Sequence, residues 1–228
     1  MTTTIWTTYH RQEQVEEYGL QENEYRRLYD VNRRGRTLMQ RNALNPAWSE
    51  LVTLWHVWRN QLKSDLVGFN HYRRQFEPMD VKEGECQIFA CEHFGGMTIE
   101  EQYALCHDRY DFDTLLRVMR ADPENTPYIN HLRFDHALIK CCCFLMTWQD
   151  FDRMCAWMFP LMERVQCDLI GLAADTNPTT ILRAWHEKAV NTFGEERADY
   201  QMRTPSFLAE RLIGVWIMHN LRVVNPEQ

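Results

Sequence analysis

Short apolar segments alternate with longer amphipathic ones along this chain of 228 residues. The first, "TTIWTTY" at 3–9, consists of β-branched and aromatic residues, which favour strands. In the longer segments apolar residues recur at three- and four-residue spacing, which indicates one buried face of a helix. Strands that alternate with helices predict a layered α/β fold with a mostly parallel central sheet. Further strands are expected at 66–69, 86–91 and 137–146, and helices at 45–60, 98–120 (broken near 108), 150–166, 178–193 and 205–220.

Individual residues mark where some of these elements begin or end. In the tryptophan-rich helix, Asn45 suits the N-cap and Pro46 the first helical position. The tryptophans of that helix are expected to lie in the core. Pro160 is expected to kink or interrupt its helix. The stretch 10–45 is polar and rich in arginine, and "VNRRGR" within it predicts a loop.

The charge balance argues against one class of function. The formal net charge is −7, with 25 Lys+Arg against 32 Asp+Glu, whereas binding to a phosphate backbone favours a basic surface. No general nucleic-acid-binding coat is therefore expected. The first residues lack the basic start and apolar run of a signal peptide, and no apolar run reaches the ~18 residues that cross a bilayer. These features predict a cytoplasmic protein without a transmembrane segment. Because the sequence shows no internal repeat, low-complexity segment or obvious linker, a single domain over 1–228 is expected.

Eight cysteines, three of them consecutive at 141–143, are expected to be reduced, because nothing in the sequence predicts secretion. A zinc site is a minor alternative, since the spacing lacks the paired knuckles of zinc domains. Its ligands would be Cys86, Cys91, His93, Cys106 and His107. The triplet "DFD" at 111–113 has the Asp-x-Asp form of a metal site. It precedes an amphipathic segment, however, so an N-cap and a first-turn acid explain it better.

The segment "VGFNHYRRQF" at 67–76 is the most informative about function. An apolar strand runs directly into His71, Tyr72, Arg73 and Arg74. Arginine presents a planar, permanently charged fork that matches phosphate oxygens, and open α/β sheets bind ligands beyond the carboxyl ends of their strands. Because side chains alternate along a strand, one arginine is expected to reach the ligand, with His71 on the side of Arg73. The alternative is that the two arginines form salt bridges that stabilise the fold and do not bind a ligand.

Three segments, in this order, resemble the domain-of-unknown-function family 4422, found among capsular and surface polysaccharide glycosyltransferases. They are "NPAWSELVTLWHVWRN", "DLVGFNHYRRQF" and "RTPSFLAERLIGVWI", and "CCCFLMTWQDFDRMCAWMFPLME" resembles the strand and helix between them. The resemblance spans roughly residues 3–222, and the Gly-x-x-His-Tyr-Arg-Arg-x-Phe segment is its most specific part. The matching positions are Asn45, Glu50, Leu51, Trp55, Trp58, Asn60, Gly68, His71, Tyr72, Arg73, Arg74, Phe76, Arg203, Phe207, Glu210, Arg211 and Leu212.

The resemblance implies a GT-A-like nucleotide-diphospho-sugar transferase, a hexosyl- or pentosyltransferase of polysaccharide biosynthesis. Such an enzyme would move a sugar from a UDP-sugar to a hydroxyl of a glycan acceptor. If the reaction inverts, a carboxylate must accept the acceptor's proton, and Glu50 and Glu210 are the acids at matching positions. The candidate donor-binding residues are His71, Tyr72, Arg73, Arg74, His10, Arg203 and Arg211.

Two departures from the family pattern bear on the substrates. The chain has "VNRRGRTLMQRN" where the family has a Gly/Asp/Asn-rich stretch, and Cys142 and Cys143 where it has Asn–Met. No Asp-x-Asp pair ends a predicted strand, so no metal ligand is assigned, and a divalent Mn²⁺ or Mg²⁺ cofactor stays open. Two alternatives are a transferase acting on a sugar or hydroxyl of modified DNA bases, and a non-catalytic nucleotide- or sugar-binding module. Donor sugar, acceptor, stereochemical outcome and oligomeric state are also left open.

Overall fold

A six-stranded sheet in the order β2-β1-β3-β7-β4-β8 forms the centre of the computed structural model, which describes residues 1–32, 41–139 and 141–225. The strand β1 pairs in parallel with β2 and β3, and β4 pairs in parallel with β8. Within this sheet β7 runs against its neighbours β3 and β4. The predicted α/β fold with a mostly parallel sheet is thus confirmed. The strands are β1 (Thr3–Tyr9), β2 (Arg26–Asp30), β3 (Leu66–His71), β4 (Glu85–Ile88), β7 (Phe144–Thr147) and β8 (Arg222–Val224).

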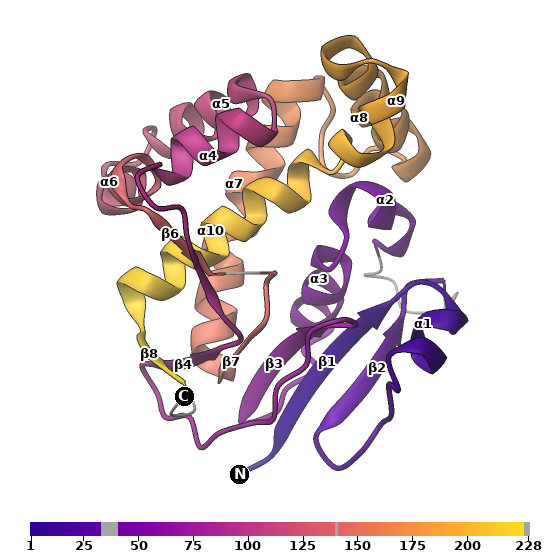
Figure 1. Ribbon diagram of the computed structural model, residues 1–228, viewed down its shortest axis with the longest axis vertical. Helices are drawn as coiled ribbons and strands as arrows, with labels where there is room; N and C mark the ends of the chain where they lie inside the picture. The colour runs from indigo at the N-terminus through magenta and orange to yellow at the C-terminus, as the bar shows by residue number, and fades with distance from the viewer. Residues whose placement is uncertain (33–40, 140, 226–228) are drawn as a thin grey trace.

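Helices form a layer beside the sheet (Figure 1). The helix α10 runs diagonally from the region of α8 and α9 down to β8, and contacts α7, α6, α5 and α2 on its way. A second, two-stranded sheet pairs β5 (Cys91–His93) with β6 (Ala137–Ile139). The helices are α1 (Gln12–Glu17), α2 (Asn45–Trp48), α3 (Leu51–Arg59), α4 (Ile99–Cys106), α5 (Arg109–Met119), α6 (Thr126–Phe134), α7 (Trp148–Ile170), α8 (Pro178–Phe193), α9 (Glu195–Gln201) and α10 (Thr204–Asn220), with 3₁₀ turns at Asn42–Leu44 and Pro123–Asn125.

The helix α10 is buried on almost every side. It carries an apolar run, and a helix that is apolar all round belongs in a protein core. Leu208, Leu212 and Val215 are at most 1% exposed, and the large ring of Trp216 is also buried. The polar residues that this helix does carry are therefore held by a well-packed scaffold.

Several predicted elements are confirmed, and one helix is divided where a single one was expected. The strand at 3–9, the break near 108 and the helices at 178–193 and 205–220 are present. The predicted helix at 45–60 is wrong as one element, because Ser49 has a left-handed φ of 49° and separates α2 from α3. Asn45 is the first residue of α2, and the N-cap is Leu44.

Two predicted strands are also divided. The segment 137–146 was expected to be one central strand, but β6 and β7 belong to different sheets. Between them Cys141 and Cys142 have φ of 64° and 51°, which turns the chain. The segment 86–91 likewise contributes to β4 and to β5. The division allows Cys86 to lie in the main core while the side chains of β5 are exposed.

Other differences concern the polar N-terminal stretch and Pro160. The stretch 10–45 contains α1 and β2, which the sequence did not predict. Most of the loop predicted from "VNRRGR" lies outside the described residues. The helix α7 is 23 residues long and contains Pro160 in its interior, so the predicted interruption is wrong. Packing on both sides of the proline maintains the helix despite the missing N–H donor.

The "DFD" triplet takes part in helix packing. The N-cap of α5 is Asp108, whose carboxylate accepts from the backbone N–H of Tyr110, so Asp111 is not the N-cap. Asp111 is the first-turn acid and is 1% exposed. Its Oδ1 lies 2.7 Å from Lys188 Nζ of α8, and its Oδ2 accepts from Thr204 Oγ of α10 at 2.8 Å. Asp111 therefore joins three helices.

Within the described part of the chain, none of the helices combines the length and the apolar character that a membrane span requires. The cytoplasmic location and the single-domain organisation stay predictions.

Gly68 is the point at which β3 is most tightly enclosed, and its replacement is expected to destabilise the protein. A Cβ atom at this position would lie 2.9 Å from the carbonyl oxygen of Phe144 and 3.2 Å from Cγ1 of Ile5. Gly68→Ala is therefore expected to lower the free energy of unfolding by about 1–3 kcal/mol. Urea denaturation measures this. Gly96→Ala, where a Cβ meets nothing within 4 Å, is the control; equal stability of the two variants would contradict the prediction.

Candidate functional site

The site lies where β1 and β3 end side by side. The two strands are parallel, with Thr8 opposite His71, so their carboxyl ends meet at one edge of the sheet. His10 follows β1, and a tight turn follows β3, closed by a hydrogen bond from the N–H of Arg74 to the carbonyl of His71 at 2.8 Å. This is the edge at which open α/β sheets bind ligands.

Two cavities of about 360 and 320 Å³ open at this edge and share one wall. We call the first the strand chamber and the second the helix chamber. The shared wall consists of Glu50, His71, Arg73 and Arg203. The strand chamber is further lined by Thr8, His10, Asn45, Pro46, Ser49 and Tyr72. The helix chamber is further lined by Arg74, Glu92, Phe94, Gln102, Cys106, His107, Leu138, Cys141, Cys142, Tyr200, Ser206, Phe207, Glu210 and Arg211.

Arg73 and Arg74 both line the helix chamber. The expectation that strand alternation would turn them to opposite sides is wrong, because β3 ends at His71 and the following residues form a turn. Arg74 donates from Nη1 to Cys141 Sγ at 2.8 Å. The guanidinium of Arg73 lies 5.3 Å from the centre of the Tyr72 ring. Arg73 thus contributes its charge to both chambers.

His71 is a neutral hydrogen-bond donor to Glu50. Burial, together with Arg73 and Arg74, lowers the pKa of His71 to about 4. Its Nδ1 accepts from the backbone N–H of Arg73 at 3.1 Å, so the proton of the neutral ring is on Nε2. Nε2 lies 3.3 Å from Oε1 of Glu50. Since the imidazole is uncharged, this contact is a hydrogen bond and not an ion pair.

Glu50 stands at the centre of the shared wall. It precedes α3, directly after the break at Ser49, and 20% of its side chain is exposed. Burial raises its pKa above the usual range, although Arg203 and Arg73 act in the opposite direction. Arg203 is held beside it by a hydrogen bond from Nε to Ser49 Oγ at 3.0 Å. The break at Ser49 therefore positions both the carboxylate and a neighbouring cation.

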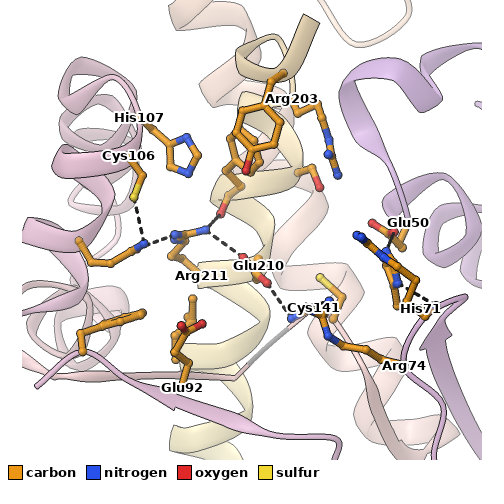
Figure 2. Close-up of a pocket in the computed structure, with 18 residues that line it drawn as sticks. Glu50, His71, Arg74, Glu92, Cys106, His107, Cys141, Arg203, Glu210 and Arg211 are labelled. Carbon is orange, nitrogen blue, oxygen red and sulfur yellow. Dashed lines mark hydrogen bonds and ion pairs between the residues drawn. The ribbon is translucent and has the colours of Figure 1, made fainter. Parts of the chain in front are cut away.

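Glu210 is engaged through both carboxylate oxygens. Oε1 accepts from the backbone N–H of Cys141 at 2.7 Å, and Oε2 accepts from Arg211 at 3.0 Å. Arg211 also donates to the carbonyl of Phe207 and to Oε1 of Gln102, and only 3% of its surface is exposed. Figure 2 shows this pair between Glu50 and His71 on one side and His107 on the other.

All nine residues singled out from the sequence line one or both chambers. They differ, however, in burial and in how many hydrogen bonds they already make. Arg211 is buried and donates through both Nη1 and Nη2, so its geometry suits support of Glu210 better than contact with a ligand. His10 and Tyr72 line the strand chamber, with ring centres 6.0 Å apart.

Sequence reasoning missed the far wall of the helix chamber. His107 was considered only as a zinc ligand, and Tyr200 was not considered. The ring centre of His107 lies 4.0 Å from that of Phe207 in a stacked arrangement. The single available signal was the match of Phe207 to the family pattern.

The described side chains at this edge of the sheet do not form a metal site. Among residues 1–32, 41–139 and 141–225, no group of three or more His, Cys, Asp or Glu side chains is placed to hold an ion. The cysteines and histidines of the zinc alternative are accordingly not brought together. Near the shared wall, Glu210 already binds Cys141 and Arg211, and Glu50 binds His71. The cations beside them are Arg73, Arg74 and Arg203.

The comparisons with known proteins agree with this geometry. Residues 41–97 match the family model described as domain of unknown function (DUF4422), so the resemblance is confirmed over α2, α3, β3 and the arginine turn. The fold matches the apo structure of the bifunctional glycosyltransferase WbbM over 99% of this chain, with a TM-score of 0.72 and 16% identity. The chain spans less than half of that protein, 44% of its length. This match shows that the chain shares the fold of that glycosyltransferase. No curated protein matches the chain.

The low pKa values in the site predict a pH-dependent stability. His107, like His71, has its pKa lowered to about 4, mainly by burial. Between about pH 6.5 and 4 the unfolded chain binds more protons at these residues, so acidification favours unfolding by up to ~1.4 kcal/mol per pH unit for each. His107→Gln is expected to reduce the loss of stability over this range. Urea denaturation at several pH values measures it, and parallel curves for the two proteins would contradict the prediction.

Proposed function

We propose that this protein is a glycosyltransferase that moves a sugar from a nucleotide-diphospho donor, a UDP-sugar in the first instance, to a hydroxyl of a glycan acceptor. One observation carries the proposal. Arg73, Arg74 and Arg203 converge with Glu50 at the carboxyl ends of two parallel strands, where two chambers meet. The GT-A-like fold supports the same assignment.

The arginines suit the diphosphate of the donor. As the glycosidic bond breaks, negative charge grows on the leaving phosphate oxygens, and fixed cations stabilise that charge. Arg73 belongs to both chambers, so it is placed where a diphosphate at their junction would lie. The nucleoside would then occupy the strand chamber, beside His10 and Tyr72. In this proposal the arginines balance the negative charge of the leaving diphosphate without a metal ion.

Glu50 is the better candidate for the base of an inverting reaction. The acceptor oxygen would attack the anomeric carbon, the bond from that carbon to the phosphate oxygen would break, and the acceptor's proton would pass to a carboxylate. Both oxygens of Glu210 are already bound, whereas Glu50 contacts the neutral His71 and faces both chambers. A raised pKa also makes Glu50 a stronger base at neutral pH.

Arg73→Ala is expected to weaken UDP binding about 10- to 100-fold, because one charge-assisted hydrogen bond to phosphate contributes ~1.5–3 kcal/mol. The melting temperature should hardly change, since Arg73 is exposed and lies over the Tyr72 ring. Isothermal titration calorimetry with UDP, with and without EDTA, measures the affinity. Arg109→Ala, an arginine with 63% of its side chain exposed, is the control. Loss of folding together with loss of binding would instead support a structural salt-bridge node.

Glu50→Gln is expected to lower turnover at least about 100-fold, because proton transfer to a positioned base contributes 10²–10⁴. UDP affinity should stay within about threefold, since the amide keeps the shape of the side chain. Release of UDP from a panel of UDP-sugars measures turnover, including slow hydrolysis of the donor.

Glu210→Gln is the comparison and should act mainly on stability. Turnover that survives in Glu50→Gln and disappears in Glu210→Gln would reverse the assignment, and UDP binding with no turnover in the wild type would favour a non-catalytic binding module.

A further inference from the structure

The far wall of the helix chamber combines aromatic faces with the imidazole ring of His107. The rings of His107 and Phe207 stack at 4.0 Å with an interplanar angle of 24°, and Tyr200 packs on Phe207 at 5.2 Å. Tyr200 is 55% exposed although it lines the cavity. Phe94 and Leu138 add apolar surface to the same chamber. This wall is not explained by the binding of a diphosphate.

The protonation of His107 follows from its partners. Gln201 donates from Nε2 to the carbonyl of Cys106 at 3.0 Å, so its Oε1 is the atom that accepts from His107. That oxygen lies 3.0 Å from Nδ1 of His107, which therefore carries the proton. With the ring neutral, Nε2 keeps its lone pair. His107 lines the helix chamber, and Figure 2 shows it on the side opposite Glu50 and His71.

We propose that this wall is an acceptor-sugar subsite, formed by Tyr200, Phe207 and His107. A sugar ring presents apolar C–H faces and hydroxyl edges, which match aromatic surface and a neutral acceptor nitrogen respectively. One hydroxyl of the bound sugar donates to Nε2 of His107. A ligand pocket that is mostly apolar, with a few placed polar groups, is the usual architecture for such recognition.

The arrangement of the two chambers assigns this subsite to the acceptor and not to the donor. The inference rests on the proposed function, which places the donor nucleotide in the strand chamber. Glu50 belongs to the wall between the chambers, so a sugar held in the helix chamber approaches the proposed base from the side opposite the nucleotide. The neighbouring cation Arg211 is bound to Glu210, Phe207 and Gln102. Recognition of an anionic group by Arg211 is therefore not part of the subsite.

The test uses saturation-transfer NMR with the UDP-loaded full chain and methyl α- and β-D-glucopyranoside, -galactopyranoside and -mannopyranoside as probes. At least one glycoside is expected to bind, and Tyr200→Ala should weaken its binding at least about fivefold through the loss of ring contact. Tyr110→Ala is the matched control, because Tyr110 is 59% exposed on α5 and lines neither chamber. His107→Phe, which keeps the ring and removes the nitrogens, should also weaken binding.

The outcomes separate the subsite from the proposed function. Binding that depends on Tyr200 and persists under saturating UDP supports the subsite. The inference is overturned if no glycoside binds the wild type, if Tyr200→Ala and Tyr110→Ala bind equally well, or if UDP displaces the glycoside. Failure of UDP to bind in calorimetry would count against the proposed function, while glycoside binding sensitive to Tyr200 would still establish the sugar site. Melting temperatures of all variants identify any that fail to fold.

Discussion

The parallel pairing of β1 with β3 determines where the polar groups of the site lie. All residues of β3 are buried, and the close approach of β1 and β7 to Gly68 leaves that strand little freedom to shift. Because the two strands run in the same direction, the residues that follow each of them emerge at one edge. His10 and the turn of His71 to Arg74 are neighbours for this reason. The positions of the clustered arginines are therefore determined by the apolar packing of the sheet.

A second constraint ties the C-terminal helix to this edge. Cys141 and Cys142 both adopt left-handed backbone conformations, each of which costs a non-glycine residue about 1–2 kcal/mol. The bond from the N–H of Cys141 to Glu210 offsets part of that cost, since a carboxylate is a strong acceptor. The same carboxylate neutralises the buried Arg211. Glu210 thus stabilises the turn between β6 and β7 and the core of α10 at the same time, which leaves Glu50 as the acid facing both chambers.

The sequence predicted the parts of the structure that depend on local pattern. β-Branched and aromatic residues were sufficient to predict β1, and the spacing of apolar residues to predict α10. The arginine turn was placed correctly at a strand end. The breaks at Ser49 and at Cys141 were missed because neither residue is typical of a left-handed turn, and tertiary bonds to Arg203 and Glu210 support them. The wall of His107, Tyr200 and Phe207 was missed because its residues come from three separate segments, which only helix packing brings together.

The two buried histidines of the site are neutral and add no positive charge to that of its arginines. A protonated His71 would add a cation beside Arg73 and Arg74 and would bind Glu50 as an ion pair, which would weaken that carboxylate as a base. Burial and the arginines prevent this by keeping the pKa of His71 near 4. Burial has the same effect on His107, whose acceptor nitrogen is available only in the neutral ring. Fixed positive charge in the site is thus carried by arginines, which suit a diphosphate. The far wall of the helix chamber adds aromatic surface and an uncharged acceptor, which suit a sugar.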